Sequence, residues 1–364
     1  MNESWIRGSL WDRIALRWTK AGPAQTDPIE ILREFREASK ILILPNDRVG
    51  GLFIGASFYK VIRQFYPQAQ ITLLVEEKKV SIARQIPFID SVLAVALDKP
   101  VWSAAFKKIA DNLRRERFDL CFCLGPDCSF RLAQLSSVCG ARLRVGFHRR
   151  GLSLFNVEVV PKKSAIYEGE QYLNMLRLFG LGGESKVRWT LAQGNAQQIR
   201  ARYLDEEFAR GFIVAIDLAP GEGEGLSVRQ LEDIVGRVIE RGALAVLFFS
   251  LAEKKQVNYL KETYGRRVMP FGQDDLPGVA ALVEGCAALI SCNTDLLHLG
   301  LALQIPIVGI FAEDPQRWIP PHNQLVHTIQ VREPRAVGIE RVMEGLEMAL
   351  KGKREDGEKT PHNE

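Results

Sequence analysis

Several residues that could do chemistry lie close together in one short stretch, "SCNTDLLHLGLALQIPIVGIF", residues 291–311. The stretch is typical of a buried strand end, a polar turn, a helix and a second apolar strand. Thr294 lies at or near the N-cap of the helix, where its hydroxyl can bond a free backbone amide or face an anion. His298 follows four residues later, one helical turn along the same face, although a partly buried structural histidine is the alternative interpretation. With Asn293 and Asp295, the turn is a candidate site for a phosphorylated ligand.

A second candidate loop, "LPNDRVGGLF", joins an apolar strand to a helix near the start of the chain. Gly50 and Gly51 let the backbone approach a ligand, and the helix presents free amides and a partial positive charge at its N-terminus. Asp47 and Arg48 are the charged side chains of this loop. Because many strand-to-helix turns contain two glycines, the loop predicts a binding site only together with other signals.

A third loop, "APGEGEG" at 219–225, is also rich in glycine. It lacks the Lys-Ser/Thr ending of a phosphate-binding P-loop. Glu222 and Glu224 would repel phosphate, but both can accept hydrogen bonds from sugar or ribose hydroxyls. Together with Gly221, they make this loop a candidate for binding the sugar part of a ligand.

These loops are positioned by an alternation of short apolar runs and amphipathic segments that begins at Lys40. The first series of candidate strands covers 41–44, 71–75, 91–95, 119–124 and 142–147. A second series follows Gly182 and Gly183, with the runs "FIVAID", "ALAVLFF", "RVMPF", "AALISC" and "PIVGIF". Serial alternation of strands and helices predicts an α/β chain with mainly parallel sheets, here in two Rossmann-like domains at 39–185 and 186–345 that face each other across a cleft.

The ends of the predicted strands determine where a ligand is expected. In parallel sheets, ligands bind beyond the carboxyl ends of the strands, so the loops after Leu44, Leu218 and Cys292 should surround one site. The polar, charged tail at 346–364 has no apolar stripe towards its end and is predicted to be disordered. The first 38 residues are predicted to form an amphipathic extension.

The extension carries an apolar stripe at helical spacing within residues 4–20, with three of the chain's six Trp residues. The stripe consists of Ile6, Leu10, Ile14 and Trp18, and its cations are Arg7, Arg13, Arg17 and Lys20. A helix at a membrane interface needs such a face, with tryptophan at the depth of the lipid headgroups. The alternative is a helix packed on its own domain or on a second subunit.

Composition and cysteine spacing narrow the class of protein. The net charge of +4 comes from interspersed charges, which do not indicate nucleic-acid binding. The six cysteines lie at 121, 123, 128, 139, 286 and 292, without the spacing of a zinc site. We expect reduced core thiols in a cytoplasmic protein, with no metal or other cofactor. No apolar run approaches the roughly 20 residues that span a bilayer, and the start lacks the apolar region of a signal peptide.

A family resemblance covers the chain from about Lys40 to Pro321. The segments that carry it, in order, are "ILILPNDRVGGLFIGASFYKVIRQFYPQAQITLLV", "FIDSVLAV", "FDLCFCLGPDCSFRLAQLSSVCGARLRVGF", "YEGEQYLNMLRLFGL", "LAPG" and "ISCNTDLLHLGLALQIPIVGIFAEDPQRWIPP". In these segments the chain resembles the ADP-heptose lipopolysaccharide heptosyltransferases, inverting glycosyltransferases of GT-B fold.

The resemblance implies transfer of a heptose from an ADP-sugar to the growing lipopolysaccharide core, at the cytoplasmic face of the inner membrane. The first domain would receive the acceptor, and the second would hold the donor's diphosphate on helix amides. An aspartate of the first domain would deprotonate the acceptor hydroxyl, and direct displacement would invert the configuration. No metal is implied.

The chain departs from the family at the general base. The family usually has Gly-Asp at the start of the first helix, and this chain has Gly50 followed by Gly51. Asp47, four residues before Gly51, is the nearby carboxylate and becomes the candidate base. Arg48, Gly50 and Gly51 are the residues expected of the acceptor loop.

The chain departs again at the donor turn. The family's Asp-Thr-Gly-Pro-Met-His is here Asn-Thr-Asp-Leu-Leu-His, so only Thr294 and His298 are kept. Asp295 replaces a glycine, and a carboxylate about 4 Å from a phosphate charge would be repelled by about 4 kcal/mol at an effective dielectric near 20. The basic stretch that usually follows the family's Pro-Gly is replaced by "GEGEG". The residues expected around the donor are Gly221, Glu222, Asn293, Thr294, Asp295 and His298.

Two functions fit these observations. The first is a divergent transferase that acts on a lipopolysaccharide core or a related surface glycan. The second is a non-catalytic GT-B pseudo-transferase, a scaffold that contacts the membrane or a partner protein through its N-terminal segment. The basic stretch "ARLRVGFHRRG" also suggests contact with acceptor phosphates, and a structural role is the alternative. Its basic residues are Arg142, Arg144, His148, Arg149 and Arg150.

Overall fold

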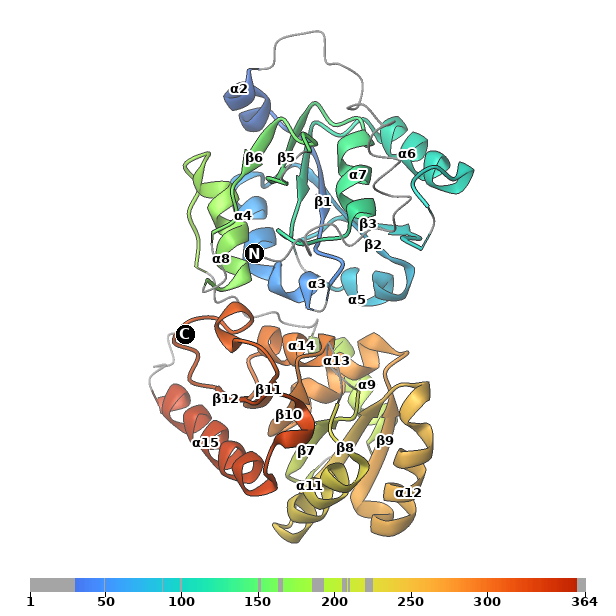
Figure 1. Ribbon diagram of the computed structural model, residues 1–364, viewed down its shortest axis with the longest axis vertical. Helices are drawn as coiled ribbons and strands as arrows, with labels where there is room; N and C mark the ends of the chain where they lie inside the picture. The colour runs from blue at the N-terminus through green and yellow to red at the C-terminus, as the bar shows by residue number, and fades with distance from the viewer. Residues whose placement is uncertain are drawn as a thin grey trace. The chain divides into compact units, whose positions relative to one another are not determined.

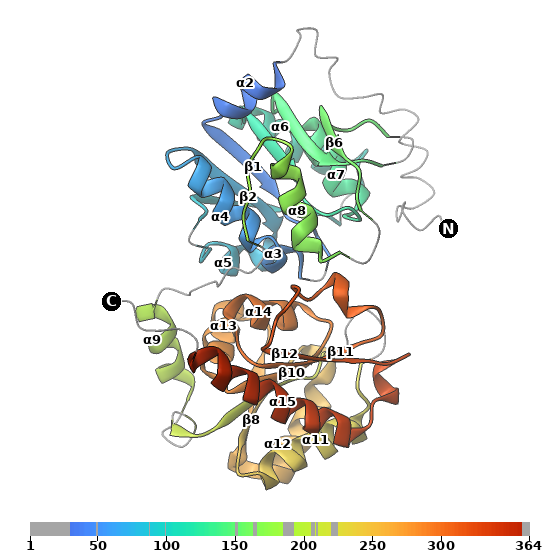
Figure 2. The same cartoon turned by 90° about the vertical axis from the view of Figure 1, so that its left-hand side faces the viewer.

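The computed structural model describes residues 30–358, apart from 49, 87, 99, 150–151, 163–165, 185–192, 205–207, 209 and 220–224. For 193–195 and 353–358 it describes the backbone only. The chain divides into two compact units, Met1–Val187 and Arg188–Glu364. Each unit contains a six-stranded parallel sheet with helices on both faces (Figures 1 and 2).

The sheet of the first unit has the strand order β3-β2-β1-β4-β5-β6. Its strands are β1 Lys40–Leu44, β2 Gln70–Glu76, β3 Ser91–Val95, β4 Leu120–Cys123, β5 Leu143–Phe147 and β6 Val157–Val159. In the central pairings, Ile41 of β1 is in register with Ile71 of β2 and Leu120 of β4. The first five strands confirm the predicted apolar runs. β6, a three-residue edge strand whose side chains are only half-buried, was not predicted.

The helices of the first unit cover both faces of its sheet. They are α2 Ile31–Arg36, α3 Gly51–Ile54, α4 Ala56–Phe65, α5 Val80–Ala83, α6 Ala104–Glu116, α7 Phe130–Val138 and α8 Glu168–Arg177. Helices α4 and α8 pack on one face of the sheet, and α6 and α7 lie on the other (Figures 1 and 2). Ser103 and Ser129 cap α6 and α7, each accepting a hydrogen bond from a backbone amide three residues on.

The sheet of the second unit has the order β12-β11-β10-β7-β8-β9, the same pattern as in the first unit. Its strands are β7 Ile213–Asp217, β8 Leu244–Phe249, β9 Val268–Gly272, β10 Ala288–Cys292, β11 Ile307–Phe311 and β12 Val326–Gln330. The first five confirm the second predicted series. Ile216, Ile290 and Val308, from the three neighbouring strands β7, β10 and β11, are fully buried, and each such side chain stabilises the fold by about 1.5–3 kcal/mol.

The second unit has helices α9 Gln193–Tyr203, α11 Val228–Glu240, α12 Lys254–Tyr264, α13 Leu276–Gly285, α14 Asp295–Leu303 and α15 Ile339–Glu358. Helices α9, α13 and α14 cover one face of the sheet, and α11, α12 and α15 cover the other (Figures 1 and 2). Ser227 and Gln230 form a capping box that starts α11.

Both sheets reverse their strand order beside the first strand of the unit. β1 lies between β2 and β4, and β7 lies between β8 and β10. Loops leave the carboxyl ends of such neighbouring strands in opposite directions, which opens a crevice where ligands bind in this class of sheet. The loops of interest after β1, β4, β7 and β10 all start at these two reversal points.

Two predictions about the chain ends need correction. The tail from 346 is not disordered up to Glu358, because α15 continues through it. Leu346 and Ala349 extend the apolar stripe of Val342 and keep the helix packed on the sheet. At the other end, residues 31–36 form α2, and Phe35 stacks on Phe179 at 3.9 Å between ring centroids, so this part of the predicted extension belongs to the first unit.

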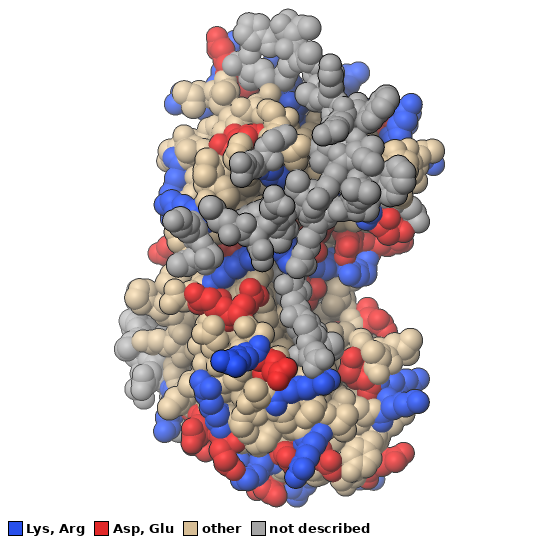
Figure 3. Space-filling view, viewed as in Figure 1, with Lys and Arg blue, Asp and Glu red and all other residues tan. Residues whose placement is uncertain are grey.

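The distribution of surface charge and the burial of the cysteines are as the sequence predicts. On the face shown in Figure 3, basic and acidic side chains are intermixed over both units, as the interspersed charges of the sequence predict. All six cysteines lie in the described part of the chain, where they are buried and form no disulfide. Among the described helices, none has the length and apolar character needed to cross a membrane. The predicted apolar helix within residues 4–20 lies outside the described residues.

Candidate active site

The polar turn after β10 is fixed by the N-cap of α14. Thr294 is the N-cap residue, and its hydroxyl oxygen accepts a hydrogen bond from the amide of Leu297 at 3.4 Å. The same hydroxyl donates to Oδ2 of Asp217 at 2.5 Å. The predicted capping role of Thr294 is therefore confirmed, and the cap is anchored to the end of a second strand, β7.

Asp217 is the centre of this hydrogen-bond network and is only 2% exposed. Its Oδ2 accepts from the hydroxyls of Thr294 and Ser291, the latter at 2.9 Å. Its Oδ1 accepts from Gln273 Nε2 at 2.8 Å and from the amide of Ala219 at 3.1 Å. Burial raises the pKa of Asp217 to about 6, although these hydrogen bonds favour the ionised form. One carboxylate thus joins the carboxyl ends of β7, β9 and β10.

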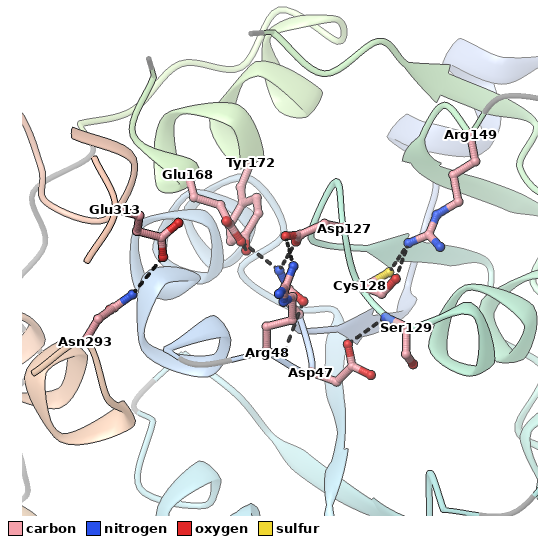
Figure 4. Close-up of polar contacts among 11 residues, drawn as sticks. Asp47, Arg48, Asp127, Cys128, Ser129, Arg149, Glu168, Tyr172, Asn293 and Glu313 are labelled. Atoms are coloured by element: carbon pink, nitrogen blue, oxygen red, sulfur yellow. Dashed lines mark hydrogen bonds and ion pairs between the residues drawn. The ribbon is translucent and has the colours of Figure 1, made fainter. Parts of the chain in front are cut away.

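A second set of contacts links the turn to the loop after β11. His298 is 1% exposed, and its Nε2 lies 2.9 Å from Oδ1 of Asn293. Because an amide oxygen only accepts, this contact places a proton on Nε2 of the histidine. Asn293 Nδ2 donates in turn to Oε1 of Glu313 at 3.3 Å (Figure 4). The ring of Trp318 packs on the His298 ring, 5.6 Å between centroids.

The structure thus brings together Asn293, Thr294 and His298, three of the predicted donor residues. Asp295 is the first residue of α14 and is half-buried, so its charge lies at the positive end of the helix. Gly221 and Glu222, the other two predicted residues, fall in 220–224 and lie outside the described residues.

In the first unit, Asn46 organises the loop between β1 and α3. Its Nδ2 donates to Oε1 of Glu168 at 2.8 Å and to Oδ1 of Asp127 at 3.1 Å, and its Oδ1 accepts from the amide of Arg48 at 3.2 Å. Glu168 is fully buried and also accepts from the hydroxyl of Tyr172. This network connects the loop with α8 and with the loop after β4.

The two charged residues of this loop have different partners. Arg48 forms an ion pair with Asp127, from the loop after β4. Asp47 is half-buried, and its Oδ1 accepts a hydrogen bond at 2.8 Å from the amide of Ser129, the N-cap residue of α7 (Figure 4). Asp47 also borders a small pocket. The other lining residues are Pro45, Asn46, Leu52, Leu74, Val75, Glu76, Lys79, Leu97 and Leu132.

The glycine pair explains why a carboxylate is absent from the start of α3. Gly50 has φ +71°, a left-handed conformation that favours glycine. A Cβ on Gly51 would lie 2.1 Å from the backbone oxygen of Asn46. No side chain fits at Gly51 unless the loop moves, so a carboxylate near this loop has to come from another position.

The described basic residues on either side of β5 have partners within their own unit. Arg142 pairs with Glu34 at 2.5 Å, and His148 pairs with Glu158 at 2.7 Å. Arg149 Nη2 donates to the backbone oxygen of Cys128 at 2.5 Å (Figure 4). These contacts favour the structural interpretation of the stretch.

Comparison with known proteins identifies the family of this chain. The model of glycosyltransferase family 9 (heptosyltransferase) matches residues 106–344, about two thirds of the chain. This chain belongs to glycosyltransferase family 9. The match runs from α6 to α15 and so includes the whole Asp217 network and the turn that it anchors.

Individual heptosyltransferases are also similar to this chain. The chain is 22% identical to lipopolysaccharide heptosyltransferase 2 of Escherichia coli K12 over 311 aligned residues. The alignment covers 80% of this chain and 88% of that protein. The structure of E. coli ADP-heptose lipopolysaccharide heptosyltransferase II superposes with a TM-score of 0.69 at 18% identity, over 86% of this chain and 99% of that one. E. coli heptosyltransferase WaaC with ADP gives 0.69 at 18% identity, over 85% and 99%. The predicted GT-B type of α/β fold is confirmed.

Several residues of this candidate site were not predicted from the sequence. Asp217, Asn46 and Glu168 carry the two buried networks, and Glu313 contacts the turn after β10. A strand-closing aspartate in "IVAID" was the visible signal for Asp217. In the part of the chain that the structure describes, no three His, Cys, Asp or Glu side chains are grouped as metal ligands.

Proposed function

We propose that this chain transfers a heptose or a similar sugar from an ADP-sugar to a lipopolysaccharide core or a related surface glycan, with inversion. The observation that carries the proposal is the family 9 match, which spans the helix-capping turn at the reversal point of the second sheet. The names of the similar proteins include an ADP-heptose heptosyltransferase and a heptosyltransferase with ADP, which supports this class of donor.

At the donor end, we place the diphosphate at the N-terminus of α14. Helix N-termini attract anions through their backbone amides and the helix dipole. Thr294 and Asp217 hold the turn in place through the 2.5 Å hydrogen bond between their side chains. The proposal assigns no metal or other cofactor to the reaction.

At the acceptor end, the proposal makes Asp47 the general base. One of its carboxylate oxygens is held by the amide of Ser129, which leaves the other to accept a proton from an acceptor hydroxyl. The base would deprotonate the hydroxyl as its oxygen attacks the anomeric carbon, and ADP would leave with the bonding electrons. Gly51, the usual position of the aspartate, has no room for a side chain.

Calorimetry and turnover test the proposal in two steps. The purified protein is titrated with ADP-heptose, with ADP and UDP-sugars as comparators. We expect binding of the ADP compounds at micromolar strength, about −8 kcal/mol. Absence of heat with every compound, from a protein shown to be folded, would favour the non-catalytic scaffold instead.

The second step is the Asp47→Asn variant, assayed for transfer to a core acceptor. General-base catalysis contributes roughly 10²–10⁴-fold, so we expect a loss of that size in kcat with donor affinity unchanged. Asp111→Asn is the matched control, because Asp111 pairs with Arg114 on the exposed face of α6. Full turnover in Asp47→Asn would remove Asp47 from the mechanism.

We further propose that the protein acts at the cytoplasmic face of the inner membrane. The support is the sequence of residues 4–20, with its apolar stripe, cations and tryptophans. Sedimentation with anionic vesicles tests this proposal on the full chain and on a chain that lacks these residues. Equal binding of both chains would contradict it.

A further inference from the structure

We propose that Glu313 binds hydroxyl groups of the donor sugar and so determines which sugar the enzyme accepts. This inference deepens the proposed function and rests on it. Glu313 lies two residues after β11, whose carboxyl end is paired in parallel with that of β10, with Ile310 in register with Cys292. Glu313 therefore lies at the same edge of the sheet as the turn that begins with Asn293.

Glu313 is held in place from two directions. The Asn293 amide donates to its Oε1 at 3.3 Å (Figure 4), and Asn293 is itself held by His298 at 2.9 Å. Five residues beyond Glu313, the 1% exposed Trp318 packs its ring on that of His298. Between them, Asp314 caps a short 3-10 helix by accepting from the amide of Gln316 at 3.0 Å. The carboxylate is thus positioned before any ligand arrives, which reduces the entropy lost on binding.

The chemistry of Glu313 suits a polyol. An ionised carboxylate only accepts hydrogen bonds and has about four lone-pair sites, so the amide of Asn293 leaves several of them for hydroxyl donors. Within the described residues, Asn293 is the hydrogen-bond partner found for this half-buried side chain. The negative charge would repel the diphosphate, so the group that it favours is the sugar.

Asn293 is the residue that makes this arrangement stable. The heptosyltransferases that this chain resembles usually have an aspartate at this position. Two ionised carboxylates 3.3 Å apart would repel each other. An amide instead donates to Glu313 and accepts from His298 at the same time. Asn293 and Glu313 therefore depend on each other. Compared with the family's usual sequence, the negative charge lies on the neighbouring loop instead of the turn.

Titration of the full chain with ADP and with ADP-heptose tests the inference on the Glu313→Gln variant. Glutamine keeps the size of the side chain and removes its charge. We expect ADP to bind within about twofold of wild type and ADP-heptose to bind about tenfold more weakly, a change of about 1.4 kcal/mol. Glu262→Gln, at an exposed position on α12, is the matched control and should bind both compounds as wild type does.

Three outcomes would overturn the assignment. Unchanged ADP-heptose affinity in Glu313→Gln would show that the carboxylate does not contact the sugar. An equal loss for ADP and ADP-heptose would show that the substitution disturbs the turn instead. Both results leave the proposed function standing, whereas no binding of either compound by the folded wild-type protein would refute the function and this inference together.

The double variant Asn293→Asp/Glu313→Gln tests whether sugar binding needs the negative charge at position 313 or only a negative charge at one of the two positions. The double variant keeps one carboxylate and one amide in contact, with the carboxylate returned to the turn. We expect its ADP-heptose affinity to stay as low as that of Glu313→Gln. Recovery of wild-type affinity would show that either position serves, and would overturn the specific assignment to Glu313.

Discussion

The buried carboxylate of Asp217 should make the stability of the protein depend on pH. Its pKa is raised to about 6 by burial, against an ordinary value of 3.8. Because one pKa unit corresponds to about 1.4 kcal/mol, ionisation of Asp217 should lower the free energy of unfolding by about 3 kcal/mol in total as the pH rises. We expect Asp217→Asn to abolish this pH dependence, since the amide has the same shape and cannot ionise.

The direction of the effect follows from proton binding. Below pH 3.8 the carboxyl is protonated in both the folded and the unfolded chain, and above about 6 it is ionised in both. Between these values the folded state binds more protons than the unfolded state, so stability falls as pH rises. About 2 kcal/mol of the total should appear between pH 4.5 and 7.5.

Guanidinium unfolding of both proteins across this pH range provides the measurement. The quantity to compare is the difference in free energy of unfolding between wild type and Asp217→Asn, because the other acids contribute equally to both. The Oδ1 acceptor is kept for Gln273 and Ala219, and the hydroxyls of Ser291 and Thr294 can rotate to accept from the new amide. A difference that stays constant from pH 4.5 to 7.5 would refute the reasoning.

Substitutions at Gly51 and Thr294, each with a control variant, test the local geometry. In the same denaturant assay, Gly51→Ala should lower the free energy of unfolding by at least about 2 kcal/mol, because its Cβ would lie 2.1 Å from a backbone oxygen. Gly182→Ala is the control and should change the free energy of unfolding little, because no atom lies within 4 Å of its Cβ. Thr294→Val should cost about 2 kcal/mol through the lost cap and the lost hydrogen bond to Asp217, and Thr294→Ser should keep most of that stability. Equal stability of the valine and serine variants would contradict the role of the hydroxyl.

The apolar pattern predicted the framework well because buried parallel strands are nearly continuous runs of apolar residues. The runs "ILIL" and "PIVGIF" coincide with β1 and β11 to within one residue at each end. β6 and β12 were missed because their sequences, "VEV" and "VHTIQ", alternate apolar with polar residues over a short length and so show only a weak apolar pattern. The length of α15 was missed because its last turns are polar, although the apolar residues before them hold the helix on the sheet.

The site was predictable only where its chemistry is local. Thr294 caps a helix that starts at the next residue, so the sequence alone indicates its role. Asp217 instead meets Thr294 across 77 residues of sequence, and Asn46 meets Glu168 across 122. Such pairs depend on strand order, which the alternation of strands and helices does not specify. The lack of space at Gly51 also became visible only with the position of Asn46.

The burial of all six thiols gives the native chain built-in chemical probes. A buried cysteine reacts with an alkylating reagent only when the structure around it opens, so its labelling rate measures local opening. Cys292 ends β10 directly before the turn of Thr294, and Cys128 lies between Asp127 and Ser129, the partners of Arg48 and Asp47. Mass spectrometry of these two sites, with Cys121 as a reference in the core of β4, would follow each loop separately as a nucleotide or an acceptor is added.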